Sequence, residues 1–165
     1  MIIRQIFISS GHNYFGHHGR PPDDFPLVEV KQIECVAGHG IRGDRFYDYR
    51  DDYKGQITFF SLEVFERLAA HFKLTNKSAG ELRRNVIVSG INLNDLIGEE
   101  FSIQGVRLRG TAHCKPCYWM NQAVAPGAEA FLEGNGGLRA KILTDGVIGV
   151  GDARLELAAP RLIES

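Results

Sequence analysis

Short apolar segments, interrupted again and again by glycine-rich turns, make up most of this chain. The sequence holds 19 glycines in 165 residues, and most apolar runs between the turns have the length of strands rather than helices. Such a chain builds short strands joined by tight turns. No shift in composition divides it. We therefore expect a single domain over residues 1–165 that is mainly β, a strand-dominated barrel with a few short helices.

The pattern places nine strands and one clear helix. The strands are expected at Ile2–Ser9, Leu27–Val36, Gln56–Phe60, Val86–Val88, Glu100–Ile103, Val106–Arg109, Leu138–Thr144, Val147–Val150 and Arg154–Leu157. Two hairpins are predicted, around Gln104-Gly105 and around Asp145-Gly146. The helix covers Leu62–Leu74, with Ser61 as its N-cap and apolar residues at steps of three and four. A weaker helical stretch is expected between Ala125 and Leu132.

Charge and cysteine content exclude several classes of protein. The net charge is −1, which gives no general attraction to nucleic acid or to an anionic membrane. No segment approaches the apolar length of a spanning helix, and the N-terminus lacks a signal-peptide pattern. Three cysteines cannot all pair internally and are few for a disulfide scaffold. We expect a cytoplasmic protein without nucleic-acid or membrane partners; the sequence does not indicate its oligomeric state.

The densest group of reactive side chains is the segment His113–Cys117, which reads His-Cys-Lys-Pro-Cys. A thiolate is both a nucleophile and a soft-metal ligand, and nearby cations favour it. The segment fits thioredoxin-like disulfide exchange, a structural zinc site completed by Cys35 or His39, two ordinary half-buried cysteines, or a catalytic or cofactor-ligating Cys117 in a pocket. No second cysteine pair completes a zinc site, and a thioredoxin motif belongs near the start of alternating βα units. The last interpretation is favoured.

Two basic segments are candidates for binding an anion. Arg83-Arg84-Asn85 precedes a predicted strand, and Gly43-Asp44-Arg45 closes a glycine-rich loop. Arginine offers a planar fork that matches phosphate. Taken alone, Arg83-Arg84 is by default a solvated charge pair, and the signal of the glycine-rich segment is weak. Loop 10–26 carries three histidines, for which solvent exposure is favoured over metal binding.

Several short blocks recur in an order and spacing that resemble one known family. They are Gly43-Asp44-Arg45 with the strand at Gln56-Ile57, Arg83–Gly90, Asn92–Gly98, Pro116-Cys117, Gly136–Ala140 and Asp145–Asp152. Together they resemble the MOSC family, the module named for the C-terminal domain of molybdenum-cofactor sulfurases. The resemblance covers about residues 26–157.

The resemblance implies a MOSC-type β-barrel, similar to the barrel of pyruvate kinase, with a cleft for a molybdenum–pterin cofactor (molybdopterin). In the family, the cysteine that Cys117 matches is proposed to carry sulfur as a persulfide or to ligate molybdenum. Cys117 is then the expected catalytic residue and molybdenum ligand. The expected cofactor-binding residues are Arg45, Arg83, Arg84, Asn85, His113 and Lys115.

The sequence shows neither the pyridoxal-phosphate desulfurase domain nor the extra N-terminal barrel module of larger relatives. We therefore expect a separate sulfur donor or electron-transfer protein as partner, together with a small-molecule substrate. Two activities fit: reduction of N-hydroxylated substrates with molybdenum on Cys117, or sulfur transfer from a Cys117 persulfide. A non-catalytic carrier of cofactor or sulfur, and a Cys-x-x-Cys thiol–disulfide redox protein, are the alternatives.

Overall fold

The computed structural model describes residues 1–14, 17 and 19–160. The strands are β1 (Ile2–Ile8), β2 (Val28–Val30), β3 (Gln32–Val36), β4 (Gly40–Ile41), β5 (Ile57–Ser61), β6 (Val86–Ser89), β7 (Glu100–Ile103), β8 (Val106–His113), β9 (Leu138–Ile142), β10 (Gly146–Gly149), β11 (Gly151–Asp152) and β12 (Leu155–Leu157). The helices are α1 (Leu62–Phe72), α2 (Met120–Ala123) and α3 (Ala128–Phe131), with 3-10 turns η1 (Ala79–Leu82) and η2 (Leu93–Leu96). The fold is thus mainly β with a few short helices, as predicted.

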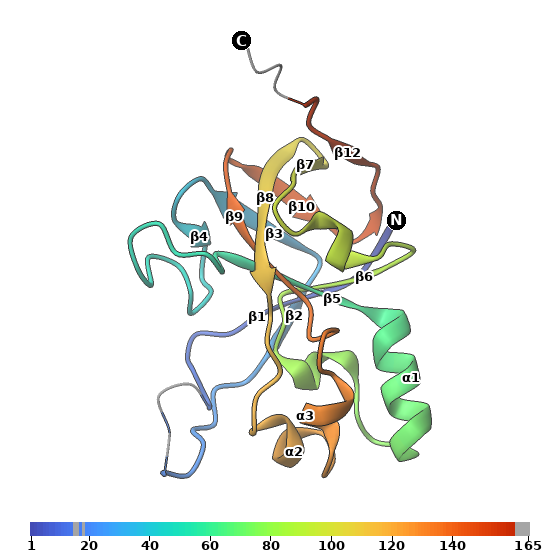
Figure 1. Ribbon diagram of the computed structural model, residues 1–165. Helices are drawn as coiled ribbons and strands as arrows, with labels where there is room; N and C mark the ends of the chain where they lie inside the picture. Colours follow the sequence, from blue (N-terminus) through green and yellow to red (C-terminus); the bar gives the residue numbers. More distant parts are fainter. Residues whose placement is uncertain (15–16, 18, 161–165) are drawn as a thin grey trace.

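One large sheet forms the body of the molecule (Figure 1). Its order is β11-β1-β6-β5-β9-β8-β7-β12, and β2 pairs with β1 as its ninth strand. All its pairs are antiparallel except β5 with β6. The sheet is open, because its edge strands β11 and β12 do not pair. Only two residues separate these strands along the chain, so the sheet curls until its edges lie close together. This makes it barrel-like.

Two sequence-based expectations about pairing are wrong. The strand expected at Leu27–Val36 breaks at Lys31, because β2 joins the large sheet while β3 joins a three-stranded sheet of order β10-β3-β4. The hairpin around Asp145-Gly146 does not form. Both edges of β9 are already taken by β5 and β8, so β10 pairs with β3 instead. The hairpin at Gln104-Gly105 is confirmed by the pairing of β7 with β8.

The predicted helix is confirmed as α1. Ser61 caps it, and the Ser61 hydroxyl accepts a hydrogen bond from the Val64 N–H. The apolar face of α1 packs on the sheet together with α2, α3 and η1, around buried Phe60 and Ile87. α3 lies within the stretch where a weak helix is expected. In the described part of the chain, no helix has the length and hydrophobicity that a membrane crossing requires.

Candidate active site

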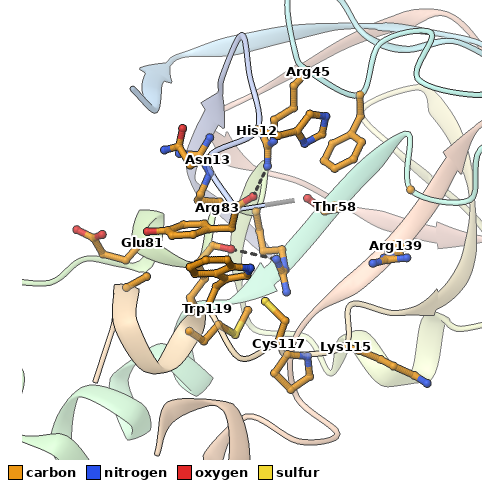
Figure 2. Close-up of a pocket in the computed structure, with 18 of the residues that line it drawn as sticks. His12, Asn13, Arg45, Thr58, Glu81, Arg83, Lys115, Cys117, Trp119 and Arg139 are labelled. Carbon is orange, nitrogen blue, oxygen red and sulfur yellow. Dashed lines mark hydrogen bonds between the residues drawn. The ribbon is translucent and has the colours of Figure 1, made fainter. Parts of the chain in front are cut away.

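A cavity of about 460 Å³ opens where three loops meet beside β5, β6 and β9. Residues 12–14, residues 45–55 and the segment 115–120 each supply part of its wall. Four arginines (Arg45, Arg83, Arg84 and Arg139), Lys115 and the thiol of Cys117 line the same cavity. Figure 2 shows Arg45 and His12 at one end and Cys117 with Lys115 at the other. Three segments distant in the sequence thus converge on one pocket.

A left-handed residue lets two adjacent arginines face this cavity. Successive side chains of an extended strand point to opposite faces. Arg83 instead follows η1 with φ 57°, which turns the chain before β6 begins at Val86. Arg83 and Arg84 can therefore both line the pocket.

Neutral oxygens hold the guanidinium groups of Arg83 and Arg84 in place. Arg83 donates to the Ser9 hydroxyl at 3.0 Å, to the Gly11 carbonyl at 3.1 Å and to the Phe25 carbonyl at 3.2 Å. Arg84 donates to the carbonyls of Gly136 and Leu82, each at 3.0 Å. Because these acceptors carry no charge, the two arginines are fixed without being neutralised.

The Arg45 side chain is deeply buried, with only 7% of its surface exposed. Its guanidinium donates to the Arg83 carbonyl at 2.9 Å and to buried Asp44 at 3.2 Å. Within the described ranges, Asp44 is the only carboxylate that forms an ion pair with an arginine of this pocket. The pocket therefore keeps an excess of positive charge.

Burial and mutual repulsion destabilise the charged forms of Arg45, Arg83 and His12 in this pocket. Burial, and then the charge of Arg45, lower the pKa of Arg83 to about 10. Burial is also the main cause of the lowered pKa of Arg45, against the opposing effect of Asp44. The pKa of His12, which also lines the pocket, is lowered by burial and by Arg45. An anion bound here would offset the repulsion.

Cys117 is the accessible thiol of this chain. It follows β8 on the segment that leads to α2 and is exposed, whereas Cys35 and Cys114 are buried, and all three are free thiols. Burial in the core raises the pKa of Cys35 to about 12. Of the three thiols, that of Cys117 is therefore the one that a ligand or a partner can reach.

A pair of glycines fixes the segment that carries Cys117. The Cys114 N–H donates to the Gly137 carbonyl at 2.8 Å. A Cβ atom on Gly136 would lie 2.0 Å from the Cys114 carbonyl oxygen, so no larger residue fits there. The sequence indicates only a turn at Gly134–Gly137, whereas the structure shows a tight contact between this turn and the cysteine segment.

Two of the expected site residues do not line the pocket. Asn85 is buried, accepts hydrogen bonds from the Thr58 N–H at 3.1 Å and the Thr58 hydroxyl at 3.0 Å, and donates to the Phe7 carbonyl at 3.2 Å. It therefore ties β6 to β5 and β1 beneath the arginines. His113 is exposed at the end of β8 and is not among the described lining residues.

Other lining residues were missed by the sequence reasoning. Arg139 reaches the pocket from β9, and Tyr53 and Trp119 reach it from loops. The signal for Arg139 was present, because it stands between buried Leu138 and Ala140 and so must face away from the core. For the zinc alternative, the structure offers no cluster of three histidine, cysteine or acidic residues suited to a metal within the described residues.

Comparisons with known proteins agree with this architecture. The model of the MOSC domain family matches residues 17–154. A solved structure of the YuaD protein from Bacillus subtilis aligns with a TM-score of 0.76 and 17% identity over 94% of each chain. The comparison with curated protein sequences found no match.

Two structures of a protein named YiiM share the fold as well. That from Escherichia coli aligns with a TM-score of 0.66 and 16% identity, over 97% of this chain and 71% of the other. That from Geobacillus stearothermophilus aligns with a TM-score of 0.67 and 18% identity, over 96% and 75%. At these identities the likeness concerns the fold alone.

Proposed function

Because this chain belongs to the MOSC domain family, we propose that its arginine-lined pocket binds a molybdenum–pterin cofactor and that Cys117 is the reactive thiol. One observation carries the proposal. The one exposed cysteine lines the same cavity as four arginines and Lys115. One ligand can therefore reach both a soft sulfur donor and a cluster of cations that binds an anion.

The chemistry of the pocket fits such a cofactor. Its phosphate requires charge-assisted hydrogen bonds, and Arg45, Arg83 and Arg84 offer guanidinium groups that mainly neutral oxygens hold in position. The lowered pKa values of Arg45 and Arg83 indicate cations that an anion would stabilise. A thiolate is a soft ligand of the kind that molybdenum accepts. Lys115 adds a further cation beside Cys117.

The first activity we propose is reduction of N-hydroxylated small molecules. The bound cofactor would supply the redox centre for this chemistry. Cys117 would hold the metal, the arginines would orient the phosphate, and the apolar side chains beside Cys117 would limit the access of water. Electrons would come from a separate electron-transfer protein.

A second candidate is sulfur transfer, which the exposure of Cys117 favours. A donor persulfide would pass its outer sulfur to the Cys117 thiolate and leave as a thiolate, so that Cys117 carries the sulfur. A partner protein can approach Cys117 but not the buried thiols of Cys35 and Cys114. In this case the chain is a sulfur carrier with a separate donor.

Metal and pterin analysis tests the proposal. The protein is produced in a host that makes the cofactor, beside Cys117→Ser, Arg84→Ala and the control Arg107→Ala, whose arginine lies on β8 outside the pocket. We expect molybdenum and pterin with the parent and the control, pterin with strongly reduced molybdenum for Cys117→Ser, and loss of both for Arg84→Ala. Equal loading of all four proteins would contradict the proposal. If the parent protein is free of metal and accepts sulfur on Cys117, the chain is a sulfur carrier.

A pair of cysteine variants separates a lone thiol from a disulfide-exchange pair. Disulfide exchange needs an attacking and a resolving sulfur, so Cys114→Ala and Cys117→Ser would then be equally damaging. We expect Cys114→Ala to keep cofactor loading or sulfur acceptance and Cys117→Ser to lose it. Equal loss in two correctly folded variants would favour the thiol–disulfide protein.

A further inference from the structure

The pocket has two chemically different ends. Arg45 and His12 lie at one end, and Trp119 lies on the side of Cys117 (Figure 2). The wall on this second side is apolar. It comes from η1, from the segment after β8 and from α2, with Leu82, Pro116, Met120 and Ala123. Phosphate binding by the arginines and metal binding by Cys117 assign no ligand contact to this apolar wall.

Trp119 gives the apolar end its shape. Its indole lies 5.3 Å from the ring of Tyr14, at an interplanar angle of 34°. Met120, which follows Trp119 as the first residue of α2, is nearly fully buried. Figure 2 shows the indole nitrogen turned toward the pocket interior. Flat aromatic surfaces of this kind favour offset-stacked or edge-on contact with another ring.

Both signs of charge occur at this end. Lys115 lies beside Cys117, and Glu81, the only carboxylate among the described residues that line the pocket, lies on the Trp119 side (Figure 2). Because these two charges oppose each other, whereas Arg45 and Arg83 gather at the other end, an anion is drawn toward the arginines. The apolar wall is left for an uncharged ligand. Ligand sites typically combine such an apolar wall with a few polar groups that fix orientation.

We propose that the apolar end is a separate substrate subsite, which takes a flat, uncharged aromatic compound against Trp119 and beside Cys117. A hydrogen-bond acceptor on the ring would meet the indole N–H. The inference rests on the proposed function only in naming this ligand a substrate. Binding itself is tested in protein without cofactor.

The first test compares an aromatic amide with its saturated counterpart. Trp119 is the only tryptophan of the chain, so its fluorescence reports on this end of the pocket. In protein saturated with inorganic phosphate, benzamide should bind about tenfold more tightly than cyclohexanecarboxamide. Equal binding of the two amides would overturn the proposal. So would competition between benzamide and phosphate, because the two ends would then be one site.

The second test uses variants and ligand-observed NMR. Trp119→Leu should weaken benzamide binding about five- to tenfold, and Trp119→Phe, which keeps a ring, should weaken it less. The control Tyr47→Leu removes an aromatic side chain that stacks on His39 and does not line the pocket, and it should bind benzamide as the parent does. Equal effects of Trp119→Leu and Tyr47→Leu would overturn the proposal.

Phosphate binding and cofactor loading separate the two proposals. Trp119→Leu should keep phosphate binding, since it leaves the arginines intact. If the parent takes up no molybdenum or pterin but binds benzamide through Trp119, the cofactor proposal fails and the aromatic subsite stands. If cofactor loading succeeds and benzamide binding is absent, the subsite fails alone.

Discussion

Burial decides which of the three cysteines can react. Cys117 is exposed, while Cys114 and Cys35 are only 2% and 0% exposed. In the folded protein near neutral pH, iodoacetamide should therefore label Cys117 first, with the other two reacting only after local or global opening. Burial also raises the pKa of Cys35 to about 12, which removes its reactive thiolate. Peptide mass spectrometry measures the order in which the three cysteines are labelled. Labelling of Cys35 as fast as Cys117 would contradict the structure.

His12 reports on the charge of the pocket. Burial and Arg45 lower its pKa below the ordinary value of 6.5. The unfolded chain therefore binds a proton on His12 more tightly than the folded protein does. The stability that the folded protein has with neutral His12 is full above pH 6.5 and is lost as the pH falls below that value. Bound phosphate should raise the His12 pKa, since an anion favours the charged imidazolium. NMR titration with and without phosphate measures this. His71, on α1 outside the pocket, is the control, and a His12 signal as insensitive to phosphate as that of His71 would place the anion elsewhere.

At the residue scale, the sequence predicts the pocket's charge better than its geometry. Arg45, Arg83, Arg84, Lys115 and Cys117, which the sequence offers as candidates, line one cavity. Asn85 and His113 do not, for local backbone reasons that no motif reveals. Asn85 instead bonds to Thr58 and Phe7, and His113 is exposed at the end of β8, just after the register shift between Gly110 and Ala112.

The glycine turn before β9 supports the cysteine segment. Gly136→Ala would bring a Cβ atom to 2.0 Å from the Cys114 carbonyl oxygen, so the segment must shift. We expect a loss of about 1–3 kcal/mol in the free energy of unfolding, together with a changed alkylation rate of Cys117. Gly149→Ala is the matched control, because its nearest contact would be an ordinary 3.6 Å. Chemical denaturation and thiol labelling measure the two effects. An unchanged Cys117 in Gly136→Ala would show that the turn does not position it.

Elements defined by local chemistry were predicted, and those defined by competition between strands were not. α1 follows from its cap at Ser61 and its apolar spacing. The Asp145-Gly146 segment has an equally good local signal, yet no hairpin forms there because β5 and β8 already occupy both edges of β9. Asp145 instead accepts a hydrogen bond from the Ala37 N–H at 2.7 Å, beside the small sheet. Local pattern cannot reveal which strand edges are free.

At the scale of the whole molecule, the net charge does not reveal the positive charge of the pocket. The chain carries a formal charge of −1, which excludes a general attraction to polyanions. Folding nevertheless gathers five lysine and arginine side chains around one cavity, with a single carboxylate among the described residues that line it. The barrel-like sheet makes this possible, because β5 and β9 are adjacent and β6 pairs with β5. Thr58 on β5, Arg139 on β9 and Arg84, just before β6, therefore meet at one place.

An anion that fills this pocket should stabilise the whole fold. A ligand that binds only the folded state adds about 2.7 kcal/mol at about 100 times its Kd, which for a domain of this size is a rise of about 5–10 °C in Tm. We expect inorganic phosphate to raise the Tm of the parent and of Arg107→Ala, but to have little effect on Arg84→Ala. Chloride at matched ionic strength controls for screening, to which exposed charges respond most. Calorimetry with each salt measures the difference. The same phosphate response in Arg84→Ala as in the parent would mean that the stabilising anion binds outside the pocket.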